Sequence, residues 1–250
     1  MRFLIPVFLL LCFLPGPGGR AWGAATPGEP EVTARAAVLA DARTGQVLWA
    51  RNPDLRAYPA STTKILTALV VVMRAGLGDE VRVAPEDTDA GGSAIWLRPG
   101  EVLSVEDLLY ALLLNSANDA AEALARHVAG SDGDFARLLN DTALALGATN
   151  THFTNPSGMP DSDHYTTARD LAIIARAALA HPVLRNIMAT RTHQIRRQDP
   201  EAVNYLVNHN KLLWRYPGAI GMKTGYTAEA GQCLVAAAQR GERTLIAVVL

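Results

Sequence analysis

The feature that most constrains the fold is the position of the strand-like segments, which lie at both ends of the chain with a long helical stretch between them. Two short apolar runs, Ala36–Ala40 and Gln46–Ala50, flank a turn that contains Gly45, and they predict an N-terminal β-hairpin. Three more strands are predicted near the other end, at Ala219–Gly225, Cys233–Ala238 and Thr244–Leu250. This order predicts an α+β fold in which one sheet is formed from both ends of the chain.

Residues 85–180 have a different character, because their apolar residues recur at helical spacing. The periodicity predicts four helices, at Val105–Leu114, Asp119–Val128, Asp134–Leu146 and Thr167–Leu179. A second hairpin is predicted after them, from Thr192–Arg197 and Val203–Val207. We therefore expect a helical subdomain inserted between the strands, over about residues 85–180.

The N-terminus has the pattern of a secretory signal peptide. Met1-Arg2 precedes the apolar run Phe3–Leu14, and small residues follow from Ala21 to Ala25. The run is shorter than the roughly 20 residues of a membrane span, although an uncleaved anchor or a lipid-modified Cys12 are alternatives. We expect residues 1–25 to be removed, residues 26–250 to form one domain, and the protein to be exported beyond the cytoplasmic membrane.

Composition limits the classes of partner. The chain has 250 residues, 49% hydrophobic and 19% charged, which is typical of a globular protein. Its net charge is −1 and it has no basic run, so nucleic acid is not an expected partner. The six histidines lack metal-ligand spacing, so we expect no metal and no cofactor. If Cys12 leaves with the leader, only Cys233 remains, which excludes an intramolecular disulfide.

Ser61 and Lys64 could form a nucleophile and its base. On a helix, residues three apart share a face, so a neutral Lys64 amine could take the proton of the Ser61 hydroxyl. A helix is predicted from Ser61 to about Met73 because apolar residues recur at helical spacing. Taken alone, the pair is better explained as a capping serine and a solvated lysine.

Two further motifs make the pair more specific. Ser116-Ala117-Asn118 follows a predicted helix, and Lys223-Thr224-Gly225 lies on a predicted strand. Each alone could be a helix cap or an edge strand. Together and in this order, the three motifs match the S-x-x-K, S-D-N and K-T-G set of class A β-lactamases and penicillin-binding proteins, with Ala117 in place of the aspartate.

The chain resembles penicillin-binding proteins of the serine-type D-Ala-D-Ala carboxypeptidase group. Beyond the three motifs, the likeness extends to Tyr58–Ala60, Asn155–Gly158, Thr167–Asp170 and Asn208–Leu213. The resemblance implies a β-lactamase/transpeptidase-like fold, with an antiparallel sheet flanked by helices and the site in a cleft beside a helical subdomain. Because relatives carry further C-terminal segments and this chain ends in an apolar strand, we expect a longer product, whose membrane attachment stays open.

The resemblance also implies the roles of individual residues. Ser61 would be the nucleophile, Lys64 its base, and Ser116 the group that passes the proton to the leaving amine. The substrate-binding residues would be Asn118, Lys223, Thr224, Gly225 and Tyr226, with the Ser61 and Tyr226 amides as oxyanion hole. The implied partners are peptidoglycan stem peptides ending in D-Ala-D-Ala, and β-lactams as inhibitors that acylate Ser61.

Several rival functions share these motifs. A class A β-lactamase would need a glutamate to activate the deacylating water, and the loop from Thr151 to Asp170 has aspartates but no glutamate. A transpeptidase differs only in the acceptor of the acyl group, and a penicillin sensor or a wall-binding module would use the fold without turnover. The intact Lys64 and Ser116 favour an active enzyme over these binding proteins.

Overall fold

The computed structural model of the protein describes residues 28–197, 199 and 201–250. The predicted signal peptide, residues 1–25, lies outside the described residues. Residues 34–250 form one compact unit, and residues 28–33 belong to a separate N-terminal unit. All the helices and strands of the described chain lie in the compact unit.

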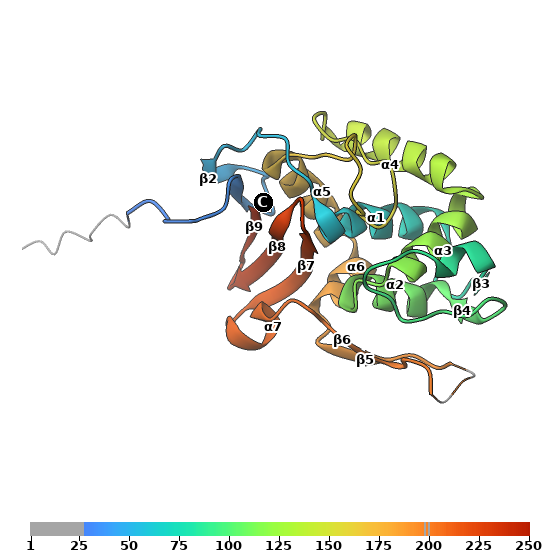
Figure 1. The fold of residues 1–250 in the computed structure, drawn as a ribbon. Helices are drawn as coiled ribbons and strands as arrows, with labels where there is room; N and C mark the ends of the chain where they lie inside the picture. Colours follow the sequence, from blue (N-terminus) through green and yellow to red (C-terminus); the bar gives the residue numbers. More distant parts are fainter. Residues whose placement is uncertain (1–27, 198, 200) are drawn as a thin grey trace, which may run out of the picture. The chain divides into compact units, whose positions relative to one another are not determined.

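A five-stranded antiparallel sheet contains both ends of this unit (Figure 1). The first two strands, β1 and β2, pair as the predicted hairpin, and β1 also pairs with the last strand, β9. In spatial order the strands are β2 (Val47–Arg51), β1 (Ala37–Asp41), β9 (Arg243–Val249), β8 (Gly231–Arg240) and β7 (Ala219–Thr227). The prediction of one sheet formed from both chain ends is therefore confirmed.

The four helices predicted from periodicity are all present, within a few residues of their predicted bounds. Three of them begin with a side-chain cap: Ser104 caps α2, Ser131 caps α4 and Thr167 caps α5. The α-helices are α1 (Lys64–Arg74), α2 (Val105–Leu114), α3 (Asn118–Ala129), α4 (Asp132–Leu146), α5 (Ala168–Ala180), α6 (Pro182–Ala189) and α7 (Leu212–Arg215).

The helix predicted to start at Ser61 begins differently. Residues Ala60–Thr63 form a 3-10 turn, and the α-helix starts only at Lys64. The hydroxyls of Thr62 and Thr63 donate to the carbonyls of Pro59 and Ala60, three residues back, at 2.7 and 2.9 Å. These bonds favour the tighter turn, so Ser61 lies in the turn that leads into α1 rather than in the helix.

Several short elements were not predicted from the sequence. The strands β3 (Glu80–Arg82) and β4 (Val102–Ser104) have three residues each and form a separate two-stranded sheet. The predicted second hairpin exists as β5 (Thr192–Gln194) and β6 (Tyr205–Val207), again as a sheet of its own. Helix α6 was also missed; it starts at Pro182, a residue that suits the first position of a helix.

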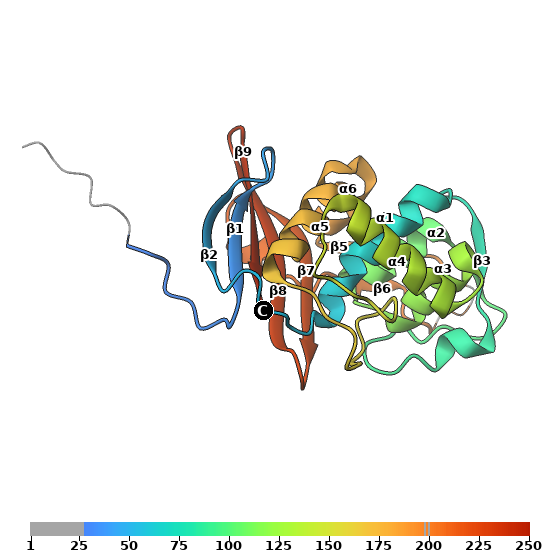
Figure 2. The same ribbon diagram turned by 90° about the horizontal axis from the view of Figure 1, so that it is seen from above.

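The helices are layered against the sheet (Figure 2). Helix α5 packs against β1 and β9, and α6 packs against β7, so part of the predicted helical insert covers the sheet itself. Helix α1 contacts α2, α3, α4 and α5 and is buried from Lys64 to Val71. Within the described part of the chain, no single helix has the length and apolar character of a membrane span; only α5 and α6 together, bent by 102°, do.

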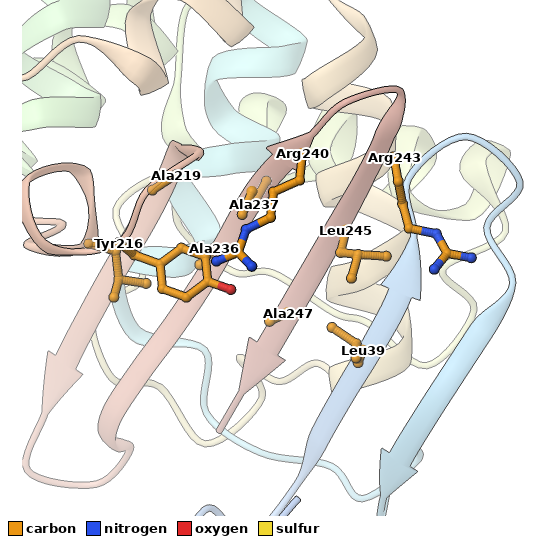
Figure 3. A pocket seen from close by; sticks show the side chains of 11 residues that line it. Leu39, Tyr216, Ala219, Ala236, Ala237, Arg240, Arg243, Leu245 and Ala247 are labelled. Atoms are coloured by element: carbon orange, nitrogen blue, oxygen red, sulfur yellow. The ribbon is translucent and has the colours of Figure 1, made fainter. Parts of the chain in front are cut away.

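A hollow of about 430 Å³ lies over strands β1, β9 and β8 (Figure 3). Its floor is apolar, with Leu39, Leu245 and Ala247, while Arg240 and Tyr216 stand at its rim. The Arg240 guanidinium lies 5.0 Å from the centre of the Tyr216 ring. None of the three motifs lines this hollow.

Candidate active site

Ser61 and Lys64 meet where the 3-10 turn joins α1. The Lys64 side chain is fully buried, and its Nζ lies 3.1 Å from Ser61 Oγ. The amine also donates to Asn118 Oδ1 at 2.6 Å and to the backbone carbonyl of Ser157 at 2.5 Å. These three oxygens hold the amine beside the serine hydroxyl, in the geometry that a serine–lysine pair requires.

Burial lowers the pKa of Lys64 well below the usual value of 10.5. The positive charge of Lys223 lowers this pKa further, while the carboxylates of Glu122 and Asp119 oppose the shift. A lowered pKa increases the fraction of Lys64 that is neutral at a given pH. Lys64 can then accept a proton from Ser61.

The second motif reaches the site through Asn118. Its Oδ1 accepts the Lys64 bond, and its Nδ2 donates to the Gly91 carbonyl at 2.8 Å. Ser116 is buried just before α3 in a left-handed conformation, with φ of +62°. Among the described residues, no hydrogen bond joins the Ser116 side chain to Ser61 or Lys64. The geometry therefore joins Asn118 to the pair by a hydrogen bond, whereas Ser116 makes no such bond to it.

The third motif lies on β7, the edge strand of the sheet, against the Ser61 turn. A Cβ added at Gly225 would lie 3.0 Å from the Ser61 amide nitrogen and 3.1 Å from the Pro59 carbonyl oxygen. Only glycine allows the strand to come this close. Thr224 is half-buried and Tyr226 is exposed, so this edge can receive an extended peptide.

Lys223 is almost fully buried, with 1% of its surface exposed. Its Nζ donates to the Thr224 carbonyl at 2.9 Å, and burial lowers its pKa to about 7. The two buried lysines of the site are close enough for the charge of Lys223 to act on Lys64. The site therefore holds two buried amines whose charges influence one another.

Sequence reasoning missed three residues that lie around Lys64. Ser157 supplies a backbone carbonyl, which no motif can reveal. The His164 ring hydrogen-bonds to Thr63, the residue before Lys64, although the two residues are 101 positions apart in the sequence. Glu122 lies one turn after Asn118 on α3, so helical spacing from the second motif was a signal that could have found it.

The carboxyl group of Glu122 is a second ionisable group behind Lys64. Burial, with the nearby charge of Asp132, raises its pKa to about 8. Its Oε2 atom is buried without a hydrogen-bond partner in the described structure. Near neutral pH a protonated Glu122 is therefore favoured, which limits the negative charge facing Lys64.

Comparison with known proteins decides the family. The sequence model of the D-alanyl-D-alanine carboxypeptidase family matches residues 23–250. The chain belongs to this family. It is 38% identical over 246 residues to the D-alanyl-D-alanine carboxypeptidase DacF of Bacillus subtilis, covering 96% of this chain and 63% of that protein. The D-alanyl-D-alanine carboxypeptidase DacB2 of Mycobacterium tuberculosis is 41% identical over 223 residues, covering 88% and 76%.

Solved structures of this carboxypeptidase family confirm the predicted β-lactamase/transpeptidase-like fold. The crystal structure of a D-alanyl-D-alanine carboxypeptidase from Mycobacterium tuberculosis matches with a TM-score of 0.84 at 40% identity, covering 88% of this chain and 83% of that one. A mutant DD-transpeptidase from Streptomyces matches with a TM-score of 0.85 at 33% identity, covering 89% and 92%. The chain thus spans less than two thirds of the Bacillus relative but most of these crystallised chains.

Proposed function

We propose that this family member is a serine-type D-Ala-D-Ala carboxypeptidase, which removes the terminal D-alanine from peptidoglycan stem peptides. The observation that carries the proposal is the buried Lys64 amine, 3.1 Å from the Ser61 hydroxyl and with a lowered pKa. A lysine in this state can act as a base at neutral pH, which a solvated lysine cannot. Membership of the carboxypeptidase family supplies the substrate class.

In acylation, Lys64 takes the proton of Ser61 Oγ while that oxygen attacks the carbonyl carbon of the penultimate D-alanine. The backbone amides of Ser61 and Tyr226 are the proposed donors to the oxyanion. The peptide bond then breaks, and the leaving amine of D-alanine takes a proton from Lys64 by way of the Ser116 hydroxyl. In the second step water attacks the ester carbonyl and loses a proton to Lys64. Lys64 passes this proton to Ser61 Oγ as the ester bond breaks and the shortened peptide leaves.

The third motif would supply the hold on the substrate. Lys223 provides a cation and Thr224 a hydroxyl for the terminal carboxylate, and Gly225 lets the peptide lie along the β7 edge. Asn118 both holds Lys64 and offers its amide to the substrate backbone. A carboxypeptidase must recognise the free carboxylate, and this strand places a positive charge next to the reacting pair.

The same site would be acylated by β-lactams, whose strained amide takes the place of the D-Ala-D-Ala bond. The proposed location is outside the cytoplasmic membrane, where the substrate is, and the support for export is the signal-like pattern of residues 1–25. A role in peptidoglycan synthesis and remodelling follows from this substrate.

A transpeptidase is the second candidate, favoured by the similarity to the Streptomyces enzyme at a TM-score of 0.85. It would pass the same acyl group to an amine instead of water. A β-lactamase is disfavoured because the loop Thr151–Asp170 contains no glutamate that could activate a deacylating water.

The direct test is release of D-alanine from a peptide ending in Lys-D-Ala-D-Ala. We expect turnover by the wild type and a loss of roughly three orders of magnitude or more in Ser61→Ala, since the nucleophile and base act as a unit. Added glycine as an acceptor amine separates the second candidate, because a transpeptidase would form the glycine-terminated product. No release of D-alanine with or without acceptor would contradict both.

A further inference from the structure

We infer that His164 is a positioning residue for the nucleophile, acting through Thr63 on the Ala60 carbonyl to hold the turn that presents Ser61. The inference rests on the proposed function, because it assigns His164 a part in the acylation of Ser61. His164 lies in none of the three motifs, and it comes to the site from the loop that precedes α5.

The hydrogen bonds of His164 fix its tautomer. The backbone N–H of Thr154 donates to His164 Nδ1 at 3.0 Å, so Nδ1 is an acceptor and carries no proton. The neutral ring then carries its proton on Nε2, which lies 2.9 Å from Thr63 Oγ1. His164 must therefore be the donor in its bond to Thr63.

Thr63 passes this bond on to the residue before the nucleophile. Its hydroxyl has one proton, which it donates to the Ala60 carbonyl at 2.9 Å. Its oxygen is free to accept from His164, and the two bonds form a chain with one direction, from His164 through Thr63 to Ala60. The chain ends on the carbonyl that immediately precedes the Ser61 amide.

Ala60 needs such support because its backbone is strained. Its φ is +48°, a left-handed conformation that a residue with a Cβ rarely adopts. Such strain persists only where surrounding contacts hold it, and it is common at functional sites. The Ala60 carbonyl is also closely packed, since a Cβ added at Gly158 would lie 2.0 Å from its oxygen.

The surroundings keep the His164 ring neutral and fixed. The ring is 1% exposed and stacks on Phe153, with 4.8 Å between ring centres. Burial lowers the pKa of the ring to about 4. Among the nearby ionisable groups, Asp161 raises this pKa, and His152 and Lys64 lower it. At neutral pH it therefore cannot serve as a proton shuttle, and its contribution is its fixed hydrogen bond.

The loop that carries His164 thus holds the nucleophile turn at two points. Ser157 accepts from Lys64 Nζ, and further along the same loop His164 donates to Thr63, the neighbour of Lys64 in sequence. Loss of the second contact would let the Ala60–Ser61 turn relax and move Ser61 Oγ away from its base. Small displacements of a nucleophile cost rate rather than binding.

The experiment compares two pairs of variants by stopped-flow labelling with a fluorescent penicillin. His164→Phe keeps the ring size and its stacking but removes the donor, whereas His164→Gln can still donate. Thr63→Val keeps the shape but breaks the chain, whereas Thr63→Ser retains the hydroxyl. Per folded molecule, we expect acylation to slow by about tenfold or more in the Phe and Val variants and to recover to within about threefold in the Gln and Ser variants.

Thr151→Val is the matched control within the same loop. Thr151 Oγ1 bonds to Thr166 and to Asp170, at 2.8 and 2.9 Å, and takes no part in the chain to Ala60. We expect its melting temperature to fall with no change in acylation rate. A purely structural role for His164 predicts the same behaviour for His164→Phe, and that result would overturn the inference. A wild type that is never labelled would instead overturn the proposed function, and the inference with it.

A second readout separates positioning from substrate binding. Since Lys223 holds the carboxylate on β7 independently of this chain of bonds, His164→Phe should lower kcat for D-alanine release with little change in KM. A rise in KM at constant kcat would contradict the inference.

Discussion

Lys64 and Lys223 are both buried, yet the proposed chemistry requires Lys64 to be neutral and Lys223 to be charged. Burial lowers the pKa of both amines, and the charge of Lys223 lowers that of Lys64 further. The two amines are coupled, because a protonated Lys223 favours the neutral form of Lys64. The carboxylate of a bound peptide would in turn favour the charged form of Lys223.

This coupling predicts a basic limb in the pH dependence of kcat/KM, which reports the free enzyme. As the pH rises through about 7, Lys223 in the free enzyme loses its proton and with it the charge that attracts the substrate carboxylate, so kcat/KM should fall. Lys223→Arg stays protonated throughout this range, so its profile should lack this limb. An unchanged limb in Lys223→Arg would contradict the assignment.

The lowered pKa of His164 predicts that the free energy of unfolding decreases at acidic pH. The pKa of His164 is about 4 in the folded protein, whereas the ordinary value of 6.5 applies to the unfolded chain. Between pH 4 and 6.5 the unfolded state therefore binds one more proton than the folded state. The stability due to neutral His164 is complete above pH 6.5 and is lost as the pH falls toward 4. Between pH 7.5 and 4.5, urea unfolding should show the wild type losing about 2–3 kcal/mol more than His164→Gln. Parallel losses would show that the ring does not titrate this way.

The residues that sequence alone could assign share one property, which is that their partners are near in sequence or follow a known spacing. Ser61 and Lys64 are three residues apart, and Asn118 and Lys223 stand in short motifs. Ser157 could not be found because it acts through a backbone carbonyl, and His164 because its partner is 101 residues away. Tertiary packing alone brings these groups to the site.

At the scale of elements, a buried arginine fastens the β5–β6 hairpin to the loop before β4. The Arg197 side chain is fully buried; its Nε lies 2.6 Å from Glu101 Oε1, and its Nη1 donates to the Ile95 carbonyl at 2.6 Å. The same loop is held from the other side, because the Ile95 and Leu97 amides donate to the Asp119 carboxylate. The buried Arg197 guanidinium and the buried Asp119 carboxylate therefore hold the loop in place.

Breaking this buried pair should be costly. Arg197→Met leaves the Glu101 carboxylate and three backbone carbonyls without their donor. We therefore expect a loss of about 3–5 kcal/mol in the free energy of unfolding. The control is Arg98→Met: Arg98 pairs with Asp199 but its side chain is 67% exposed, so a loss of about 0–1 kcal/mol is expected. Equal losses in urea unfolding would contradict the role of Arg197.

Element length decided which elements could be predicted. The helices from α2 to α5 have ten or more residues and show their apolar period clearly. The strands β3 and β4 have three residues each, too few for a period, and the start of α1 depends on hydroxyl bonds within the Ser61 turn. Local pattern is therefore sufficient for the long elements, whereas among the short strands only the β5–β6 hairpin was predicted, with the help of the turn residues between its strands.

At the scale of the whole compact unit, the two ends of the chain are joined in one sheet. Strand β9 lies between β1 and β8, with Val38 opposite Val248, and the backbone of Ala36 exchanges two hydrogen bonds with that of Leu250, at 3.0 and 2.9 Å. Such distant pairing requires most of the chain to fold before the sheet is complete. The N-terminal hairpin should therefore not open alone.

Hydrogen exchange can test this cooperation. We expect the β1 amides to exchange with the same opening free energy as those of β8 and β9, because the hairpin is held by β9. Ile246→Ala shortens a buried side chain of β9, and it should lower the opening free energies of the β1, β8 and β9 amides together, by about 2–5 kcal/mol. Faster exchange confined to β1 and β2 would show that the hairpin is an independent unit.

The central claim is that Ser61, activated by a neutral Lys64, forms the acyl-enzyme, and intact-protein mass spectrometry after addition of benzylpenicillin tests it most directly. The account predicts a long-lived adduct of one penicillin per chain, located on the peptide that contains Ser61 and missing in Ser61→Ala. A chain that returns rapidly to its unmodified mass while penicilloate accumulates, or an adduct that survives in Ser61→Ala, would contradict it.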